Sequence, residues 1–160
     1  MAHPVLSDDE ARAFFVTLQQ SPFNWTVAEL PALLAELCWT IDDSATVPGR
    51  AAIADVAWDL PGADVTMTFT GDNVDRFIVT LASSADTPTE QLEIADAFAR
   101  YANIAQDVFG ASGTRFPGDY PALRWRLKDT VLTMTNLVST ISVSWATTDL
   151  QDALDRMDSA

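Results

Sequence analysis

The chain has 160 residues, 48% of them hydrophobic and 20% charged, with 23 Asp and Glu against 9 Lys and Arg and a formal net charge of −14. This composition is globular rather than disordered, and a single domain over residues 1–160 is expected at this length. The negative charge argues against nucleic acid and anionic membrane as partners, because phosphate contacts need clustered Lys and Arg.

The location in the cell is predicted from what the sequence lacks. The first residues, "MAHPVLSDDE", have neither the basic start nor the apolar stretch of a secretory signal. No apolar run approaches the roughly 20 residues that span a bilayer. Cys38 is the only cysteine, which fits a reducing compartment. The sequence therefore predicts a cytoplasmic protein with no membrane partner.

Two helices are predicted first along the chain. Ser7 and Glu10 form a capping box that opens a helix through about Gln20. Thr26 and Glu29 form a second capping box before another helix. The apolar residues of that second helix, at helical spacing, are Leu30, Leu33, Leu34 and Leu37.

Three strands are predicted in the middle of the chain. Residues 51–60 are expected to form the first strand, in which Val56, Trp58 and Leu60 occupy alternate positions. The stretches "VTMTFT" (65–70) and "RFIVTL" (76–81) alternate in the same way on either side of a turn signal at 71–73. The two stretches are therefore expected to form a hairpin.

The strongest helix signal covers Pro88 to Phe109. A capping box begins at Thr87, and Gly110 ends the pattern. Asp96 and Arg100 have the spacing of a salt bridge on the solvent side. We expect an alanine-rich stripe to pack on the sheet, formed by Leu92, Ala95, Phe98, Ala99, Ala102, Ala105 and Phe109.

Strand periodicity returns after this helix. Residues 123–127, 132–135 and 141–145 place apolar side chains inward and Thr, Ser or Arg outward. Thr148, with Gln151 as its partner, caps a short terminal helix. The chain is therefore predicted to be an α+β domain with a single antiparallel sheet of about six strands, helices packed on one face, and the order α-α-β-β-β-α-β-β-β-α.

Few residues support catalysis. His3 is the only histidine and lies at a terminus expected to fray, so a Ser-His-Asp or Cys-His site within the fold would lack its base. Cys38, between leucine and tryptophan, is typical of a core thiol. Asp55 and Asp59 pair on one strand face, but such pairs arise by chance among 23 acids. The sequence predicts no enzyme, no metal site and no cofactor.

Four of the five tryptophans divide into two groups. Trp58, Trp125 and Trp145 fall on the inward phase of their strands and are expected in the core. Trp25 precedes a helix, and the sequence leaves open whether it packs across the helix start or forms an exposed contact.

Several segments together resemble a known family. They are "LPALLAELCWT" (30–40), "ADAFARYANIAQDVFG" (95–110), "RFPGDYPALRWRL" (115–127), the middle hairpin and the last, Ser/Thr-rich hairpin. They are similar to a family of small acidic actinobacterial proteins of unknown function, whose members look like immunity proteins of secreted polymorphic toxins. The mycobacterial antitoxin of the tuberculosis necrotizing toxin, an NAD-cleaving enzyme, is similar in kind.

The resemblance implies a protein partner and no catalytic residues. The partner would be a basic toxin domain that cleaves NAD or nucleic acid, and the immunity protein would cover its active site. The acidic charge agrees with this, because it would speed association with a basic cleft. The alternative is a secretion-chaperone-like or regulatory protein-binding module, and either could be a monomer or a homodimer.

Acidic residues around the first hairpin are the predicted partner contacts. They are Asp55, Asp59, Asp64, Asp72 and Asp75. Exposed carboxylates there could reach into a basic cleft, although each of them also suits a turn.

The stretch "RFPGDYPALRWRL" is the structural signature of the resemblance. Its signature residues are Pro117, Gly118, Asp119, Arg124, Trp125 and Arg126. The Pro-Gly pair predicts a turn, and the tryptophan is expected to face inward. The two outward arginines either pair with acids of the same chain, such as Asp59 or Asp75, or bind an anion.

Overall fold

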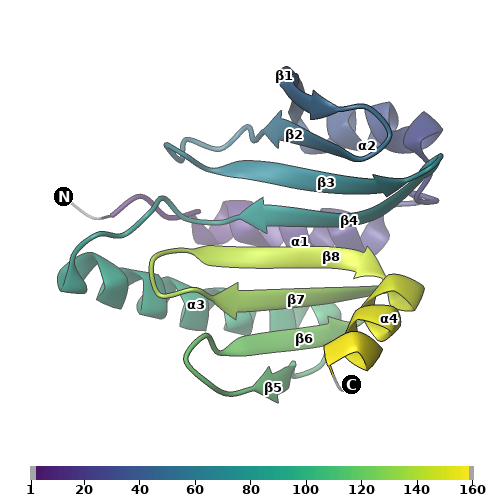
Figure 1. Cartoon of the computed structure of the whole chain (residues 1–160). Helices are drawn as coiled ribbons and strands as arrows, with labels where there is room; N and C mark the ends of the chain where they lie inside the picture. Colours follow the sequence, from purple (N-terminus) through teal and green to yellow (C-terminus); the bar gives the residue numbers. More distant parts are fainter. Residues whose placement is uncertain (1–2, 159–160) are drawn as a thin grey trace.

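The computed structural model describes residues 3–158, which form an eight-stranded antiparallel sheet with α-helices on it (Figure 1). The helices are α1 (Asp8–Gln20), α2 (Leu30–Leu37), α3 (Pro88–Phe109) and α4 (Thr148–Asp158), with a 3₁₀ turn at Val27–Glu29 before α2. The strands are β1 (Thr40–Val47), β2 (Ala51–Asp55), β3 (Asp64–Thr70), β4 (Asn73–Thr80), β5 (Thr114–Phe116), β6 (Ala122–Arg126), β7 (Thr130–Asn136) and β8 (Ile141–Thr147).

The strands lie in the order β1-β2-β3-β4-β8-β7-β6-β5. Each half of the chain is led by helices and then forms four neighbouring strands, and the two halves meet where β4 pairs with β8. Helix α3 carries the chain from the middle of the sheet to its far edge at β5 (Figure 1). The predicted α+β class with a single antiparallel sheet is confirmed, but the strand number and the element order were wrong.

The two unpredicted strands, β1 and β5, form the edges of the sheet. In β1 the exposed and half-buried positions do not alternate in steps of two, and its pairing with β2 is irregular between Asp42 and Val47. Strand β5 has 3 residues, all exposed. Edge strands bury little apolar surface, so periodicity gives no clear signal for them.

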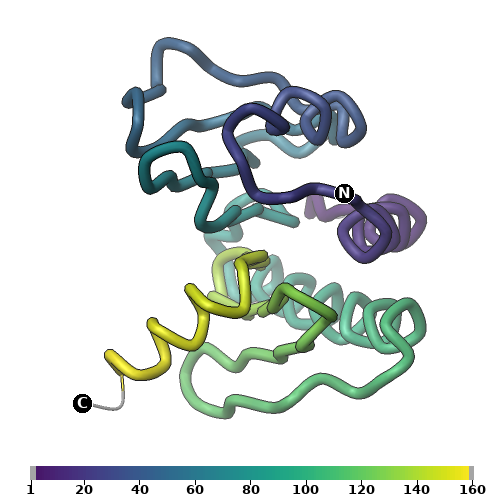
Figure 2. Tube along the Cα trace, turned by 90° about the vertical axis from the view of Figure 1, so that its right-hand side faces the viewer, coloured from purple at the N-terminus to yellow at the C-terminus, as the bar shows by residue number. Residues whose placement is uncertain are grey.

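The helices occupy both sides of the sheet. Figure 2 shows α1, α2 and α3 on one side and α4 on the other. The prediction that the helices pack on one face is therefore wrong for α4. This helix follows β8 directly and lies on the side of the sheet that the Ser, Thr and Arg side chains occupy.

The buried side of α3 agrees with the predicted alanine-rich stripe only in part: Ala105 is buried, and Phe98, Ala102 and Phe109 are half-buried against the core. The buried residues of the helix are Ile94, Ala97, Tyr101, Ile104 and Ala105. Leu92 is 68% exposed, and Ala95 and Ala99 are also exposed. A tyrosine can lie in the core because its hydroxyl donates to the backbone oxygen of Leu6. Arg100 pairs with Asp8 of α1 at 3.1 Å rather than with Asp96.

The predicted helix caps are confirmed at two of the four sites. Ser7 and Thr87 both form complete capping boxes. The hydroxyl of Thr26 accepts no capping hydrogen bond, and it donates to the side-chain oxygen of Asn24. At α4 the hydroxyl that accepts from the backbone N–H of Leu150 belongs to Thr147, one residue before the predicted Thr148.

The predicted environments of His3 and Cys38 were both wrong. His3 is buried, and its ring nitrogens lie 3.0 Å from a carboxylate oxygen of Glu90 and 2.6 Å from the backbone oxygen of Ser83. Hydrogen bonds from Thr87 and Asp86, together with this contact from His3, lower the pKa of Glu90. Cys38 is exposed and ends α2 in the left-handed conformation, so it is not a core thiol.

Candidate protein-binding face

The side of the sheet that faces away from α1, α2 and α3 is called the open face here. Its side chains alternate with the buried residues of the same strands, and most of them are hydroxyls. The open-face residues of the four central strands β3, β4, β8 and β7 include Thr66, Thr68, Arg76, Ile78, Thr133, Thr135, Ser142 and Ser144. A hydroxyl-lined face was predicted for the later strands and is confirmed.

Helix α4 covers one part of the open face. Val131 of β7 and Ala146 of β8 have the same phase as the open-face residues, yet both are fully buried. Gln151 is the buried residue of α4. The rest of the sheet on this side has no helix over it (Figure 2).

The basic cluster of β6 is neutralised by α4. Arg124 lies 3.0 Å from Asp155 and donates to the hydroxyl of Thr133, and Arg126 lies 3.0 Å from Asp152. Pairing of these arginines with acids of the same chain is therefore confirmed. The suggested partners, Asp59 and Asp75, were wrong because α4 lies over β6 on this side.

The arginines of this cluster affect the pKa of the Asp155 carboxyl group. Its partial burial acts to raise the pKa. The hydrogen bond from Gln151 and the charges of Arg124 and Arg126 outweigh that effect, so the pKa of Asp155 lies below its ordinary value. This carboxylate is therefore held in its ionised form, and it joins α4 to the sheet.

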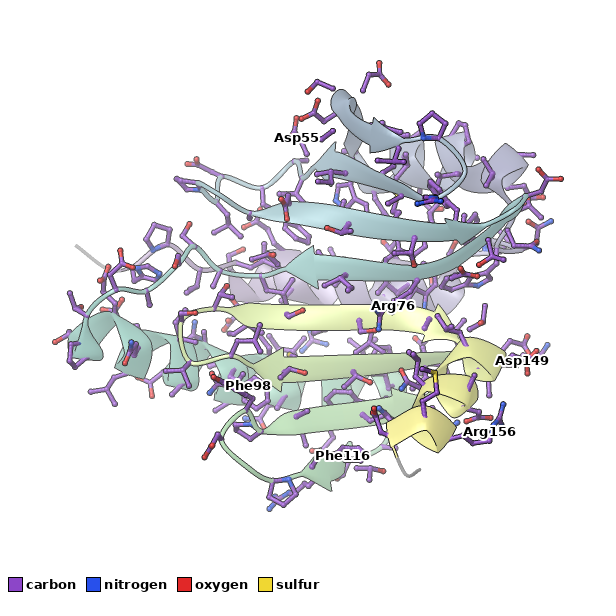
Figure 3. All side chains as sticks on the ribbon, in the orientation of Figure 1. Asp55, Arg76, Phe98, Phe116, Asp149 and Arg156 are labelled. Atoms are coloured by element: carbon purple, nitrogen blue, oxygen red, sulfur yellow. The ribbon has the colours of Figure 1, made fainter. Side chains whose placement is uncertain are left out.

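Arg76 lies near the middle of the open face, on β4, where Figure 3 labels it. Thr68 of β3 and Ala146 of β8 lie directly opposite it in the sheet. Its Nε atom and the Oγ atom of Ser144, on the neighbouring strand, are both buried and have no hydrogen-bond partner within residues 3–158. A buried polar atom without a partner costs roughly 1–3 kcal/mol, and it requires an explanation.

Arg76 differs from the other basic residues of the chain. Four arginines form ion pairs with carboxylates: Arg12, Arg100, Arg124 and Arg126. The remaining cations, in the part of the chain that the structure describes, are Arg50, Arg76, Arg115, Lys128 and Arg156, and all of these except Arg76 are exposed. Arg76 is thus a half-buried guanidinium with no carboxylate within 4.0 Å among the described residues. Sequence reasoning missed it; the signal was an arginine on the outward phase of a central strand.

The predicted acidic contacts fall into two groups at opposite ends of β3. Asp55 and Asp64 are paired directly across β2 and β3, and Asp59 lies in the connection between these strands. Figure 3 labels Asp55 near the upper edge of the sheet. Asp72 lies in the β3–β4 turn, and Asp75 accepts a hydrogen bond from Thr70 at the start of β4. The five acids therefore do not form one cluster.

The signature stretch forms the β5–β6 hairpin. Pro117, Gly118 and Asp119 lie in the connection between the two strands, and Gly118 has a φ of +143°, which glycine adopts most readily. Trp125 is buried, as predicted, and its indole N–H donates to the backbone oxygen of Ala111 at 2.9 Å. Arg124 lies over the ring of Phe116, 4.7 Å from its centre.

The tryptophan left open by the sequence is part of an aromatic cluster. Trp25 is half-buried, and its ring centre lies 4.7 Å from that of Trp145 and 5.5 Å from that of Phe77. It therefore packs against the core where β4 and β8 pair, and it is not a fully exposed contact. Trp145 is buried and Trp58 is half-buried in the same core, as predicted.

Two further properties concern the described residues alone. Within residues 3–158, no three His, Cys, Asp or Glu side chains gather in a way that could hold a metal ion. Over the same residues, no helix combines the length and the apolar character that crossing a bilayer requires.

The fold is similar to that of a solved structure, a DUF4309 family protein (YjgB) from Bacillus subtilis. The TM-score is 0.50 at 9% sequence identity, and the similarity covers 88% of this chain and 97% of that chain. At this identity the likeness shows the fold alone. No curated protein matches the sequence significantly.

The sequence itself matches one family over most of its length. The model of DUF6301, a family of unknown function, matches residues 9–147. The expected resemblance to a family of unknown function is confirmed, whereas an immunity role and an actinobacterial source stay predictions. Because the match covers well over half of the residues, the chain belongs to the DUF6301 family.

Proposed function

We propose that this protein is an immunity protein, which binds a cognate secreted toxin enzyme through the open face and covers its active site. The observation that carries the proposal is Arg76, a half-buried arginine on the open face beside the part that α4 covers, whose Nε has no hydrogen-bond partner within residues 3–158. Arginine is enriched at the centres of protein interfaces, where its planar group donates several hydrogen bonds. A carboxylate or backbone carbonyl of the partner would accept a hydrogen bond from the guanidinium of Arg76 once that side chain turns outward from its half-buried position.

The overall charge supports a basic partner. The chain carries a formal net charge of −14, and the arginines of β6 are neutralised by α4. The field at the β2–β3 end of the open face is therefore dominated by Asp55 and Asp64. Enzymes that cleave NAD or nucleic acid often have basic clefts, and opposite charge raises the rate of association. Lys128 is the only lysine, which fits the actinobacterial source that the resemblance implies.

The direct test is coexpression with the product of the neighbouring gene, which this proposal expects to be a secreted toxin enzyme. We expect the protein to restore growth of cells that express this product, and the purified pair to form a complex. Arg76→Ala should weaken binding by about 2 kcal/mol or more, or roughly thirtyfold in Kd. Arg50→Ala is the matched control, because Arg50 is exposed in the β1–β2 turn and should leave Kd unchanged. Failure to bind, or equal affinity of both variants, contradicts the proposal.

Association kinetics test the role of the acidic residues separately. Asp55→Lys should lower the association rate and flatten its dependence on salt, because the charge would repel a basic cleft. Changing both Asp72 and Asp75 to lysine should also lower the association rate if the partner covers the end of the open face at the β3–β4 turn. Asp96→Lys makes the same charge change at an exposed position on α3, on the other side of the sheet. If it slows association as much as Asp55→Lys, the acids act through net charge alone.

A second candidate is a secretion-chaperone-like module. It is favoured by the exposed side of α3, where Leu92, Ala95 and Ala99 offer an apolar strip that an unfolded client or a second copy could cover. Size-exclusion chromatography with light scattering distinguishes the two candidates. A stable dimer that Leu92→Glu converts to a monomer would favour the chaperone, whereas a monomer that binds a folded enzyme domain favours immunity.

A further inference from the structure

A groove on the helix-covered side of the sheet is separate from the open face. It lies between α3 and the β5–β6 hairpin, has a volume of about 480 Å³, and is called the α3–β5 groove here. Pockets that hold small molecules in proteins have volumes of about 300–1,000 Å³. Figure 3 labels Phe98 on α3 and Phe116 on β5, which both line it.

The walls of the groove are mainly apolar. Phe98 and Ala102 line it from α3, and Leu123 and Trp125 line it from β6. Trp125 is fixed in place, because its N–H donates to Ala111 and its ring is 5.8 Å from that of Phe109. These side chains offer a rigid aromatic surface to an apolar ligand.

The charge in the lining of the groove is positive. Of the described residues that line the groove, none is Asp or Glu, although the chain has 23 of them, and Arg115 alone is charged. Its guanidinium is exposed and has no carboxylate within 4.0 Å among residues 3–158. Asn103 and Gln106 line the groove from α3 and add amide groups. An apolar groove whose one charged lining residue is a cation favours a ligand with an anionic head group.

We propose that the α3–β5 groove binds a small amphipathic anion, which has an aromatic or aliphatic body and one carboxylate or sulfonate group. The body lies against Trp125, Leu123 and Phe98, and the anionic group meets Arg115. This site does not depend on the open face, so it stands or falls separately from the proposed immunity role.

The probe is a matched pair of dyes with the same aromatic body. Anilinonaphthalene sulfonate carries the anionic group, and N-phenylnaphthylamine lacks it; both fluoresce on entering an apolar site. We expect saturable binding of the sulfonate to the folded protein. Arg115→Gln should weaken the sulfonate about tenfold in Kd and leave the neutral dye unchanged. Arg50→Gln removes an exposed arginine outside the groove and should change neither Kd.

Filling the groove tests the location. Ala102→Trp places a large side chain in the cavity and should abolish binding of both dyes, with far-UV circular dichroism and the melting temperature as the check on folding. Should that variant fail to fold, Ser112→Trp provides a second one, because Ser112 is exposed in the loop that lines the groove. No saturable binding to the native protein, equal weakening of both dyes by Arg115→Gln, or full binding by a folded groove-filling variant would each overturn the proposal.

Discussion

At Gly113 the neighbouring side chains leave no room for a Cβ atom. A Cβ added there would lie 2.9 Å from the Trp125 ring and 3.2 Å from Leu123 Cβ. Neither neighbour can retreat easily, because Trp125 is buried and hydrogen-bonded to Ala111. The loop after α3 can therefore lie against the sheet only with glycine at this position.

We predict that Gly113→Ala lowers the free energy of unfolding by about 1–3 kcal/mol, the usual cost of forcing extra atoms into a packed site. Urea unfolding should give a lower midpoint with an unchanged slope. Ser112→Ala, one residue earlier and exposed, is the control and should change stability by about 0.5 kcal/mol or less. Equal stability of the two variants would show that the loop can shift away from Trp125 at little cost, which contradicts the prediction.

Single residues of the candidate sites were only partly predictable. The sequence correctly indicated that Trp125 is buried and that Arg124 and Arg126 pair with acids of the chain. It could not identify the partners, because Asp152 and Asp155 come close only when α4 folds back over β6. Arg76 escaped notice because its distinguishing property, burial without a partner, exists only in three dimensions.

Among the elements, α4 is joined to the sheet by ion pairs from Asp152 and Asp155 as well as by packing over Val131 and Ala146. The pKa of Asp155 is lowered in the folded protein, so the folded state favours its ionised form. A lowered pKa stabilises the fold at a pH above the ordinary carboxyl pKa, and this contribution is lost as the pH falls through the folded-state value. The attachment of α4 should therefore weaken in acid.

We predict that Asp155→Asn destabilises the protein at neutral pH and that the difference from the wild type disappears as the pH falls below the ordinary carboxyl range. Thermal unfolding from pH 7 downward measures both effects. Asp158→Asn, which removes an exposed carboxylate of the same helix, is the control and should follow the wild type. A deficit that persists undiminished in acid would show that Asp155 acts by packing rather than by charge.

Elements whose sequence signals lie within a few neighbouring residues were predicted well. Elements whose position depends on pairing with distant strands were not. The capping boxes at Ser7 and Thr87 need only residues within one turn, so the sequence was sufficient. The buried side of α3 was predicted only in part because alanine suits both faces of a helix. Tyr101 was not in the predicted stripe, and it can be buried because the backbone oxygen of Leu6 accepts a hydrogen bond from its hydroxyl. Strands β1 and β5 depend on pairing at the edges.

At the scale of the whole molecule, the seam between β4 and β8 joins the two halves of the chain. Phe77 of β4 is fully buried there, and its ring centre lies 5.3 Å from that of Trp145 on β8. The same ring contacts Phe23 and Trp25, which precede α2. The seam therefore connects the core of both halves.

We predict that Phe77→Ala lowers the free energy of unfolding by about 3–5 kcal/mol, as expected for loss of a buried ring. Tryptophan fluorescence and far-UV circular dichroism should follow one shared transition in the variant and the wild type, because one domain unfolds as a unit. Tyr120→Ala, at a position 60% exposed, should change stability by about 0.5 kcal/mol or less. Two separate transitions would contradict the single domain that the length predicts.

The two outer strands have a consequence for the behaviour of the protein at high concentration. An open sheet of eight strands has two free edges, and such edges can recruit strands from other molecules into aggregates. Here β1 carries Asp42 and Asp43 at an irregularity in its pairing, and β5 is only 3 residues long. Charge on one edge and shortness on the other both oppose strand addition. These features also explain why periodicity gave no clear signal for the two strands. They thus protect the folded protein from self-association through its sheet.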